Sequence, residues 1–289
     1  LSLIPLETLV NHNSPPEQRS RDFGFYAFSV ASGIALGTAL GMAMYAATPY
    51  WAFVLGGVAA LLAGVVVFGW LEWKTILEEQ RAGRAPLQFA DNFLSFGSGW
   101  IQGFLEGGMV SMMPLYLLWL GMSEASAGGL MGGIMIGVIV AQVPLAWLAD
   151  RIGRTAVMLG CYAVTGAVLV ALHQGLPRPA MAACLFLAGA CSGAFYPLGL
   201  AVLGERLPAL AIPRASACFL AINCAGSLVG PVATGVTMDL LGKPAIFLAG
   251  LGALLFVLIL WAVIRAHAFV NRAGAESTAE TAVAERDAA

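Results

Sequence analysis

Residues 125–175 read ASAGGLMGGIMIGVIVAQVPLAWLADRIGRTAVMLGCYAVTGAVLVALHQG, two long apolar runs on either side of one charged cluster. As helices rising about 1.5 Å per residue, the runs 125–149 and 156–175 are each long enough to cross roughly 30 Å of hydrocarbon. Helices also satisfy every backbone N–H and C=O group internally, as lipid requires. The stretch therefore predicts a helical hairpin in a membrane, with the cluster DRIGR (150–154) as its turn at one surface.

The same pattern of apolar runs separated by short polar gaps covers most of the chain. Of its 289 residues, 60% are hydrophobic and 10% are charged, and the mean hydropathy is +0.85. Soluble globular proteins carry about 25% charged residues, so this composition excludes an ordinary soluble fold. We predict an all-α membrane protein with eight spans, at 24–47, 50–72, 93–120, 125–149, 156–175, 179–204, 214–240 and 244–266.

Charge and cysteine usage exclude several other classes of protein. The formal net charge is −2, so no strongly basic surface is available to bind nucleic acid. The five cysteines lie within apolar runs, with no CxxC motif and no histidine at ligand spacing, which indicates small hydrophobic side chains rather than disulfides or metal ligands. We therefore expect no metal, no cofactor and no nucleic-acid partner. The cysteines are Cys161, Cys184, Cys191, Cys218 and Cys224.

The 14 Lys and Arg residues indicate how the chain is oriented in the membrane. When successive loops are assigned to alternate sides, only Arg178 and Lys243 fall on one side and all the others fall on the opposite side. By the positive-inside rule, the basic side is cytoplasmic. We expect a multi-pass protein of a bacterial inner membrane, with its C-terminus in the cytoplasm.

The longest polar stretch inside the chain, WKTILEEQRAGRAPLQFADN at 73–92, divides the predicted spans into two groups. Its charges, its glycine and its proline are typical of a linker between helical bundles. We predict the remainder of a first bundle at 1–72, a cytoplasmic linker at 73–92 and a six-helix bundle at 93–268. The tail at 269–289 is rich in Ala, Glu, Thr and Arg, and we expect it to be disordered or loosely helical.

An internal repeat indicates two parallel halves. The matched positions, at offsets of 192 or 193 residues, are Pro5-Leu6 with Pro197-Leu198, Arg21 with Arg214, Gly33 with Gly226 and Gly37 with Gly230. Carried back from Phe93, where the second half begins, the same offset places the start of the first half about 100 residues before Leu1. We therefore expect two parallel six-helix bundles, of which this chain lacks about the first three to four helices.

Glycine stripes on two predicted spans favour close helix packing. A glycine stands at every fourth position in Gly129, Gly133 and Gly137, and again in Gly33, Gly37 and Gly41. Small residues at this spacing lie on one helix face and let two helices approach closely in lipid. We expect these stripes to be packing surfaces rather than binding sites.

The DRIGR turn, within AWLADRIGRT at 146–155, resembles the loop signature G-x-x-x-D-R-x-G-R-R of the major facilitator superfamily. Alanine and threonine replace the first glycine and the last basic residue of the signature. The matching residues are Asp150, Arg151, Gly153 and Arg154. The resemblance implies the family's fold of two parallel six-helix bundles and places this loop between helices eight and nine. Three stretches further resemble the family's uncharacterised YcaD-like branch: GFLEGGMVSMMPLY (103–116), FYPLGLAVLGER (195–206) and GSLVGPVATGVTMDLLG (226–242).

The resemblance also implies a conformational role for this loop. In the family, the Asp and Arg residues of the loop hold helix eight against helix eleven, and the contact breaks as the bundles rock. The corresponding latch in this chain would comprise Asp150, Arg151, Gly153 and Arg154 together with Arg214, which lies at the start of a predicted helix on the same side. The alternative is a positive-inside loop with a tight glycine turn.

Glu106, at the centre of the predicted span 93–120, is the main candidate for a transport site. A charged group at mid-membrane depth costs roughly 2.5–3.5 kcal/mol on insertion scales, so such residues are functional hypotheses by default. Gln102 lies one turn earlier on the same helix face, and Val110 and Met113 continue that face. We predict that Glu106 lines the central cavity and binds a proton or contacts substrate. The alternative is a structural carboxylate paired with a basic or amide group on one of the missing helices.

Two further residues are weaker candidates for the same cavity. Asn223 lies within the predicted span 214–240. Tyr196 precedes Pro197, which should kink its helix and free a backbone carbonyl. Both would add hydrogen-bonding groups to a mainly apolar lining.

The resemblance implies alternating-access transport of a small organic solute, and Glu106 favours coupling to protons. A proton-independent facilitator, or a non-transporting membrane protein or sensor of the same fold, is the alternative. We do not expect an enzyme, because the three histidines do not cluster and no HExxH or GxSxG motif is present. A channel would need a filter sequence or charged rings, and neither occurs. The expected partners are a small-molecule substrate, protons and the lipid bilayer, with the full-length protein monomeric.

Overall fold

The structure, a computed structural model, describes residues 3–47, 49–70 and 86–287, which form helices and connecting turns and contain no strand. The helices are α1 (Leu3–Asn13), α2 (Arg19–Ala47), α3 (Pro49–Trp70), α5 (Phe93–Phe104), the π-helical turn η1 (Leu105–Val110), α6 (Ser111–Trp119), α7 (Glu124–Ile152), α8 (Arg154–His173), α9 (Arg178–Gly193), α10 (Phe195–Arg206), α11 (Ile212–Leu241) and α12 (Ile246–Asp287). Short 3-10 turns, η2 (Ala209–Ala211) and η3 (Lys243–Ala245), precede α11 and α12.

Every predicted span overlaps a helix or a run of helices, so the all-α prediction is confirmed. Among the described residues, five helices are long and apolar enough to cross a membrane: Glu124–Ile152, Arg154–His173, Arg178–Arg206, Ala209–Leu241 and Lys243–Ala268. The chain is a multi-pass membrane protein. The total of eight spans and the absence of earlier helices stay predictions.

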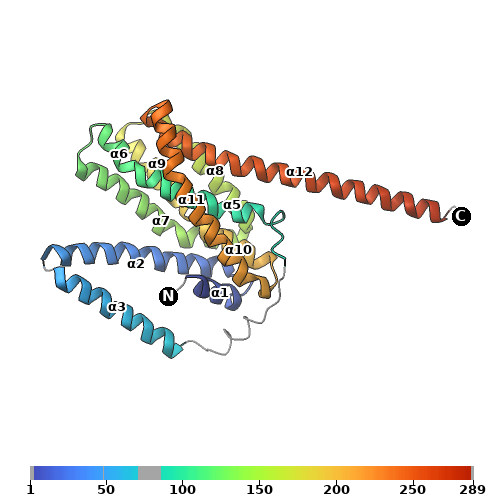
Figure 1. Ribbon diagram of the computed structural model, residues 1–289, viewed down its shortest axis with the longest axis horizontal. Helices are drawn as coiled ribbons and strands as arrows, with labels where there is room; N and C mark the ends of the chain where they lie inside the picture. The colour runs from blue at the N-terminus through green and yellow to red at the C-terminus, as the bar shows by residue number, and fades with distance from the viewer. Residues whose placement is uncertain (1–2, 48, 71–85, 288–289) are drawn as a thin grey trace.

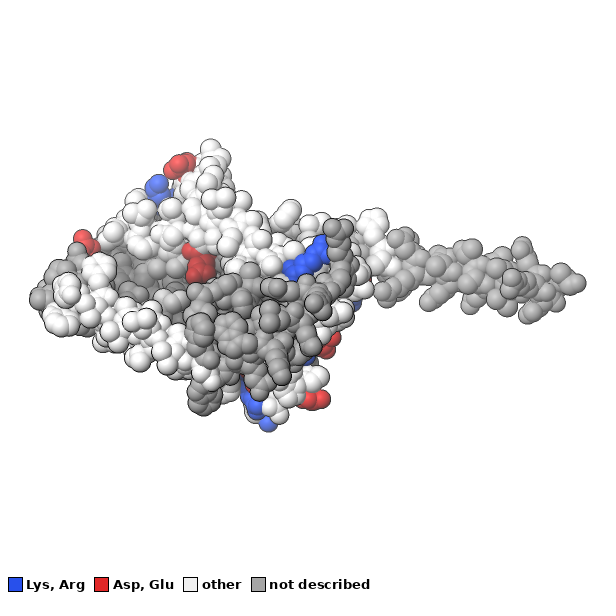
Figure 2. Space-filling model, turned by 60° about the horizontal axis from the view of Figure 1, so that its bottom comes forward, with Lys and Arg blue, Asp and Glu red and all other residues white. Residues whose placement is uncertain are grey.

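The outer surface suits a lipid environment. Large apolar side chains such as Phe53, Leu61 and Leu228 are 75%, 73% and 77% exposed. On the face shown in Figure 2, the coloured Lys, Arg, Asp and Glu side chains are few among the described residues, most of which are white. Contiguous exposed apolar surface of this extent marks an interaction with membrane or protein, and here it surrounds helices of spanning length.

Two segments, the linker 73–92 and the tail 269–289, are predicted to lie outside the spans, and the structure describes them to different extents. Of the predicted linker 73–92, residues 73–85 lie outside the described part, and 86–92 form an irregular turn that leads into α5. The predicted tail continues α12 as a helix to Asp287, where we expected disorder or loose helix. Alanine, glutamate and arginine are strong helix formers, which accounts for the continuation. Figure 1 shows this part of α12 extending away from the other helices.

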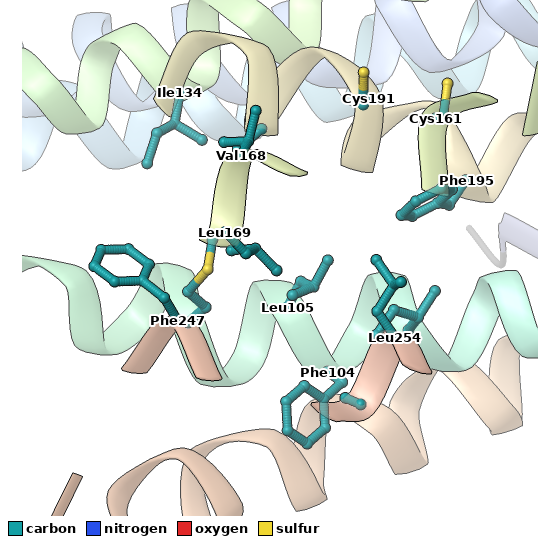
Figure 3. Close-up of a cluster of buried hydrophobic side chains, with 14 of the residues drawn as sticks. Phe104, Leu105, Ile134, Cys161, Val168, Leu169, Cys191, Phe195, Phe247 and Leu254 are labelled. Carbon is teal, nitrogen blue, oxygen red and sulfur yellow. The ribbon is translucent and has the colours of Figure 1, made fainter. Parts of the chain in front are cut away.

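The helices of the second half gather in one bundle. Figure 1 shows α5 to α11 packed together, with α2 lying along α7 and with α1 beside α10 and α11. Apolar side chains from α5, η1, α8 and α12 meet in its core, where Phe104, Leu105, Leu169, Phe247 and Leu254 are all at most 3% exposed (Figure 3). Because Leu105 is anchored in this core, the start of η1 is held in a fixed position.

Glycines bring α5 into backbone contact with α11. A Cβ atom added at Gly103 would meet the carbonyl oxygen of Asn223, and one added at Gly226 would meet that of Trp100. The amide of Asn223 donates a hydrogen bond to the carbonyl of Gly99 at 2.9 Å. In lipid, where no hydrophobic force drives helices together, contacts of this kind supply much of the packing energy.

The predicted glycine stripes are mostly not the packing surfaces. In α7, Gly137 does contact the backbone of Phe186 in α9, but an added Cβ at Gly129 or Gly133 would meet no described atom within 4 Å. The same holds for Gly33 in α2. The prediction is wrong for these positions within the described chain, because regular spacing does not show which helix face meets a neighbour.

Pro197 bends the span formed by α9 and α10, as expected. The helix breaks at Ala194, and the Gly193 carbonyl, four residues before Pro197, has no intrahelical donor because proline lacks an N–H. The Nε2 of Gln142 in α7 donates to this carbonyl at 3.0 Å. Gln142 is only 4% exposed, so this interhelical bond satisfies a buried acceptor at the bend.

Candidate functional site

A cavity of about 460 Å³ lies between α2, the α5–η1 segment, α7 and the end of α9. It therefore lies between the two predicted bundles, since α2 belongs to the first and the other helices belong to the second. Its apolar lining comes mainly from Ala31 and Ile34 of α2 and from Ile134, Met135, Val138 and Ile139 of α7. The polar side chains of the described lining are those of Gln102, Glu106 and Ser192.

Glu106 is the ionisable residue of this described lining, and its side chain is exposed to the cavity. Gln102, one helical turn earlier, lies beside it on the same face. Ser192, from the end of α9, contributes a hydroxyl to the lining. The structure thus brings together the two strongest predicted site residues, Glu106 and Gln102.

Glu106 lies in the π-helical turn η1. Pro114, within α6, cannot donate to the carbonyl of Val110, so the regular hydrogen-bond ladder is interrupted just after this turn. Within the turn, the Ser111 hydroxyl donates to the carbonyls of Gly107 and Gly108, the second at 3.2 Å. Single π-helical turns inside α-helices are rare and occur often at functional sites.

The π-helical turn also changes which residues share a face with Glu106. Val110 lines the cavity as predicted, but Met113 is fully buried in the core. A π-helical turn holds more residues than an α-helical turn, so positions beyond it are rotated relative to a regular helix. The predicted continuation of the face to Met113 is therefore wrong.

The two weaker cavity candidates lie outside the described lining. The Asn223 amide is bonded to the backbone of Gly99 and joins α11 to α5. The Tyr196 hydroxyl donates to Oε1 of Glu7 in α1 at 2.7 Å. Both side chains therefore serve contacts between helices.

Glu7 is a buried carboxylate that reasoning from the sequence did not select. Its side chain is 0% exposed, and its second oxygen, Oε2, is buried without a hydrogen-bond partner among the described residues. The available signal was an acidic residue within the otherwise apolar stretch 4–10, which the repeat matches to 196–202. That stretch is shorter than a membrane span, so the sequence alone does not indicate how deeply Glu7 is buried.

Asp150 of the DRIGR turn binds the start of α2. Its two carboxylate oxygens accept hydrogen bonds from the backbone N–H groups of Ser20 at 3.1 Å and Arg21 at 2.8 Å. These N–H groups at the beginning of a helix have no intrahelical acceptor, and the helix dipole places partial positive charge there. Asp150 therefore holds α7 of the second half against α2 of the first half.

Arg154 extends the same contact. Its guanidinium donates to Asp150 Oδ1 at 2.9 Å, to Glu205 Oε2 at 2.8 Å, to Ser20 Oγ at 2.6 Å and to the carbonyl of Pro16. With 8% of its side chain exposed, it is a buried cation surrounded by acceptors from α7, α10 and the turn before α2. Together, Asp150 and Arg154 form what we call the arginine-rich latch.

The other predicted latch residues lie around this centre. Arg151 is exposed, with its guanidinium carbon 3.5 Å from the ring centre of Trp147. Gly153 joins α7 to α8 at a φ of +103°, a conformation that glycine adopts without strain. Arg214 lies in the first turn of α11. Its pairing with the DRIGR turn stays a prediction.

Replacing Arg154 with lysine should weaken the arginine-rich latch. A lysine ammonium cannot reproduce the planar fork that reaches several acceptors at once, and Asp150 would keep a buried charge with a poorer partner. We expect a loss of about 2 kcal/mol in stability, measured as a lower thermal unfolding temperature in detergent. Arg178→Lys, at an exposed arginine of the opposite end, is the control. Equal effects of the two changes would contradict this role.

The comparisons with known proteins agree with this architecture. A sequence model of the Major Facilitator Superfamily matches residues 95–286. An uncharacterized MFS-type transporter of Bacillus subtilis (strain 168), YfkF, is 27% identical over 241 residues, which are 81% of this chain and 61% of YfkF. A relative in Yersinia pestis (strain Pestoides F), also an uncharacterized MFS-type transporter, is 33% identical over 147 residues, or 48% of this chain and 36% of the relative. The chain thus spans less than two thirds of these relatives.

Solved structures show the same fold. A bacterial homologue of the iron transporter ferroportin, in an outward-facing state, superposes with a TM-score of 0.68 at 14% identity, covering 91% of this chain and 68% of the other. The transporter FucP in an outward conformation gives a TM-score of 0.68 at 12% identity, and the match covers 90% of this chain and 72% of FucP. At these identities the likeness establishes the fold alone. The family model matches residues 95–286, and the chain therefore belongs to the Major Facilitator Superfamily, whose members are transporters rather than enzymes.

Proposed function

We propose that the full-length protein carries a small organic solute across a bacterial inner membrane by alternating access, coupled to the movement of protons. The observation that carries this proposal is the position of Glu106, in a π-helical turn that faces an apolar cavity between the two bundles. A carboxylate there can bind and release a proton where both bundles contribute walls, and an ionisable group at this depth is expensive unless it has a function.

The lining favours a largely apolar solute with a positive charge or hydrogen-bond donors. Its described polar side chains are one carboxylate, one amide and one hydroxyl, and none of its described residues is basic. A phosphate or carboxylate substrate would meet Glu106 without a compensating cation. A sugar would bring more hydroxyl groups than this lining can satisfy, and unpaired polar groups are costly.

The arginine-rich latch supports alternating access. It joins α2 and the turn before it to α7 and α10, which are elements of different bundles. In this proposal that end of the molecule faces the cytoplasm, as the positive-inside rule favours. The cytoplasmic end of the cavity is closed while the latch is formed, and it opens when Asp150 and Arg154 separate from α2.

Reconstitution of the full-length protein into liposomes tests the proposal. Accumulation of an amphipathic organic cation, driven by an imposed pH gradient, is the expected result. Movement only down its own concentration gradient, indifferent to pH, would instead support a proton-independent facilitator. No movement of any cation in a panel of sizes, by protein shown to be folded, would favour the non-transporting alternative.

A further inference from the structure

A fully buried carboxylate lies where α1 packs against α10. Glu7 of α1 is fully buried, and its Oε1 accepts the hydroxyl proton of Tyr196 in α10 at 2.7 Å. One turn further along α1, Asn11 donates from Nδ2 to the carbonyl of Leu200 in α10 at 3.4 Å. Two hydrogen bonds therefore hold α1 against α10.

Three oxygen atoms at this junction are buried and have no described hydrogen-bond partner. They are Oε2 of Glu7, Oδ1 of Asn11 and the hydroxyl oxygen of Tyr26 in α2. Protonation of Oε2 would turn this acceptor into a hydroxyl donor, whereas an ionised Glu7 would be a buried charge whose described side-chain hydrogen bond comes from Tyr196 alone.

Among the described residues that face Glu7, no cation forms an ion pair with it. From the helices packed against α1, the nearby titratable side chains are Tyr26 of α2, Tyr196 of α10 and Cys224 of α11. The charged residues on those helices lie toward their ends: Arg19, Arg21 and Asp22 on α2, Glu205 and Arg206 on α10, and Arg214 and Asp239 on α11. No ion pair given for the described residues includes Glu7.

We propose that Glu7 is a proton-binding site of the closed junction between α1 and α10, protonated while the two helices are in contact and deprotonated when they separate. A carboxylate enclosed without a cation is far more stable neutral than charged, whereas water stabilises the charge once the junction opens. Proton binding at Glu7 therefore closes this end of the molecule. The inference extends the proposed function, because it assigns a coupling proton to a place other than the substrate cavity.

The sign of the pH dependence follows from this assignment. Closure is favoured at low pH, where Glu7 holds its proton, and is lost as the pH rises and the carboxyl ionises. The Tyr196 hydroxyl bond to Glu7 exists only while α1 and α10 are in contact, so it stabilises the closed junction. Removing that hydroxyl should thus move the opening transition to lower pH, by roughly one unit.

Distance measurement between two spin labels tests this assignment without requiring a known substrate. In the full-length protein with its native cysteines replaced, labels at Asn13, the last residue of α1, and at Ala209, after α10, report on the junction; both positions are exposed. Between about pH 5 and about pH 9 we expect the label distance to increase with pH. Glu7→Gln, a permanently neutral mimic, should keep the short distance throughout, and Glu17→Gln, at an exposed glutamate before α2, should behave like wild type.

Two outcomes would overturn the inference. The first is a Glu7→Gln variant with the wild-type pH dependence, and the second is a wild-type distance that does not change with pH. If Glu7→Gln does not fold, Tyr196→Phe carries the test: the label distance should still increase with pH, with its midpoint shifted downward, and an unchanged or higher midpoint would contradict the inference. The label distance could change with pH as expected although the protein moves no solute in liposomes. That result would contradict the proposed function but not the inference about Glu7.

Discussion

Glu106→Gln should lower proton-driven transport by the full-length protein by at least about tenfold and remove its dependence on pH. Glutamine keeps the shape and hydrogen-bonding capacity of the side chain but cannot bind or release a proton. Because Glu106 is the ionisable residue of the described cavity lining, no neighbouring group there can replace it. The measurement is solute movement in proteoliposomes at several pH values, with and without a pH gradient.

A matched control separates this effect from a general loss of charge. Glu124→Gln changes an exposed glutamate in the first turn of α7, outside the cavity, and should leave transport and its pH profile unchanged. Glu106→Asp, which keeps the titratable group but shortens its reach, should retain pH dependence at a reduced rate. Transport by Glu106→Gln with an unaltered pH profile would contradict the role assigned to Glu106.

Gly226→Ala should destabilise the protein strongly for a single added methyl group. Its Cβ would meet the carbonyl oxygen of Trp100 and lie 3.0 Å from the amide nitrogen of Phe104, so α11 and α5 must move apart. Overpacking of a close contact costs typically 1–3 kcal/mol. We expect a fall in the thermal unfolding temperature in detergent on the order of 5 °C. Gly226→Leu should prevent recovery of monodisperse protein.

Gly235→Ala is the matched control for this substitution. Gly235 lies on the same helix, and an added Cβ there would meet no described atom within 4 Å. Since alanine favours helix more than glycine by about 1 kcal/mol, Gly235→Ala should be neutral or slightly stabilising. Similar losses at Gly226 and Gly235 would show that the two positions do not differ in packing, contrary to the structure.

Reasoning from the sequence located part of the site. Glu106 was selected because a charged group inside a long apolar run is costly, and Gln102 because it shares a helix face with Glu106; both line the cavity. Asn223 was selected for its place inside a span and Tyr196 for its place before Pro197, yet both side chains bond to other helices. Such patterns identify a polar side chain that needs a partner, but they do not show whether that partner is a ligand or a neighbouring helix.

The sequence by itself determined the class of the protein. Long apolar runs must be helices in lipid, because no other structure satisfies their backbone groups, and the DRIGR turn has the residue pattern of one family. These are properties of short stretches, which need no knowledge of distant residues.

Only the tertiary structure decided which groups meet. The carboxylate of Asp150 binds the start of α2, about 130 residues away, and Glu7 meets Tyr196 across 189 residues. The close contact of α5 with α11 involves Gly103 and Gly226 rather than the more regular glycine stripes. Such pairs depend on the rotation and depth of whole helices, which are set by packing over the entire bundle and leave no local pattern in the sequence.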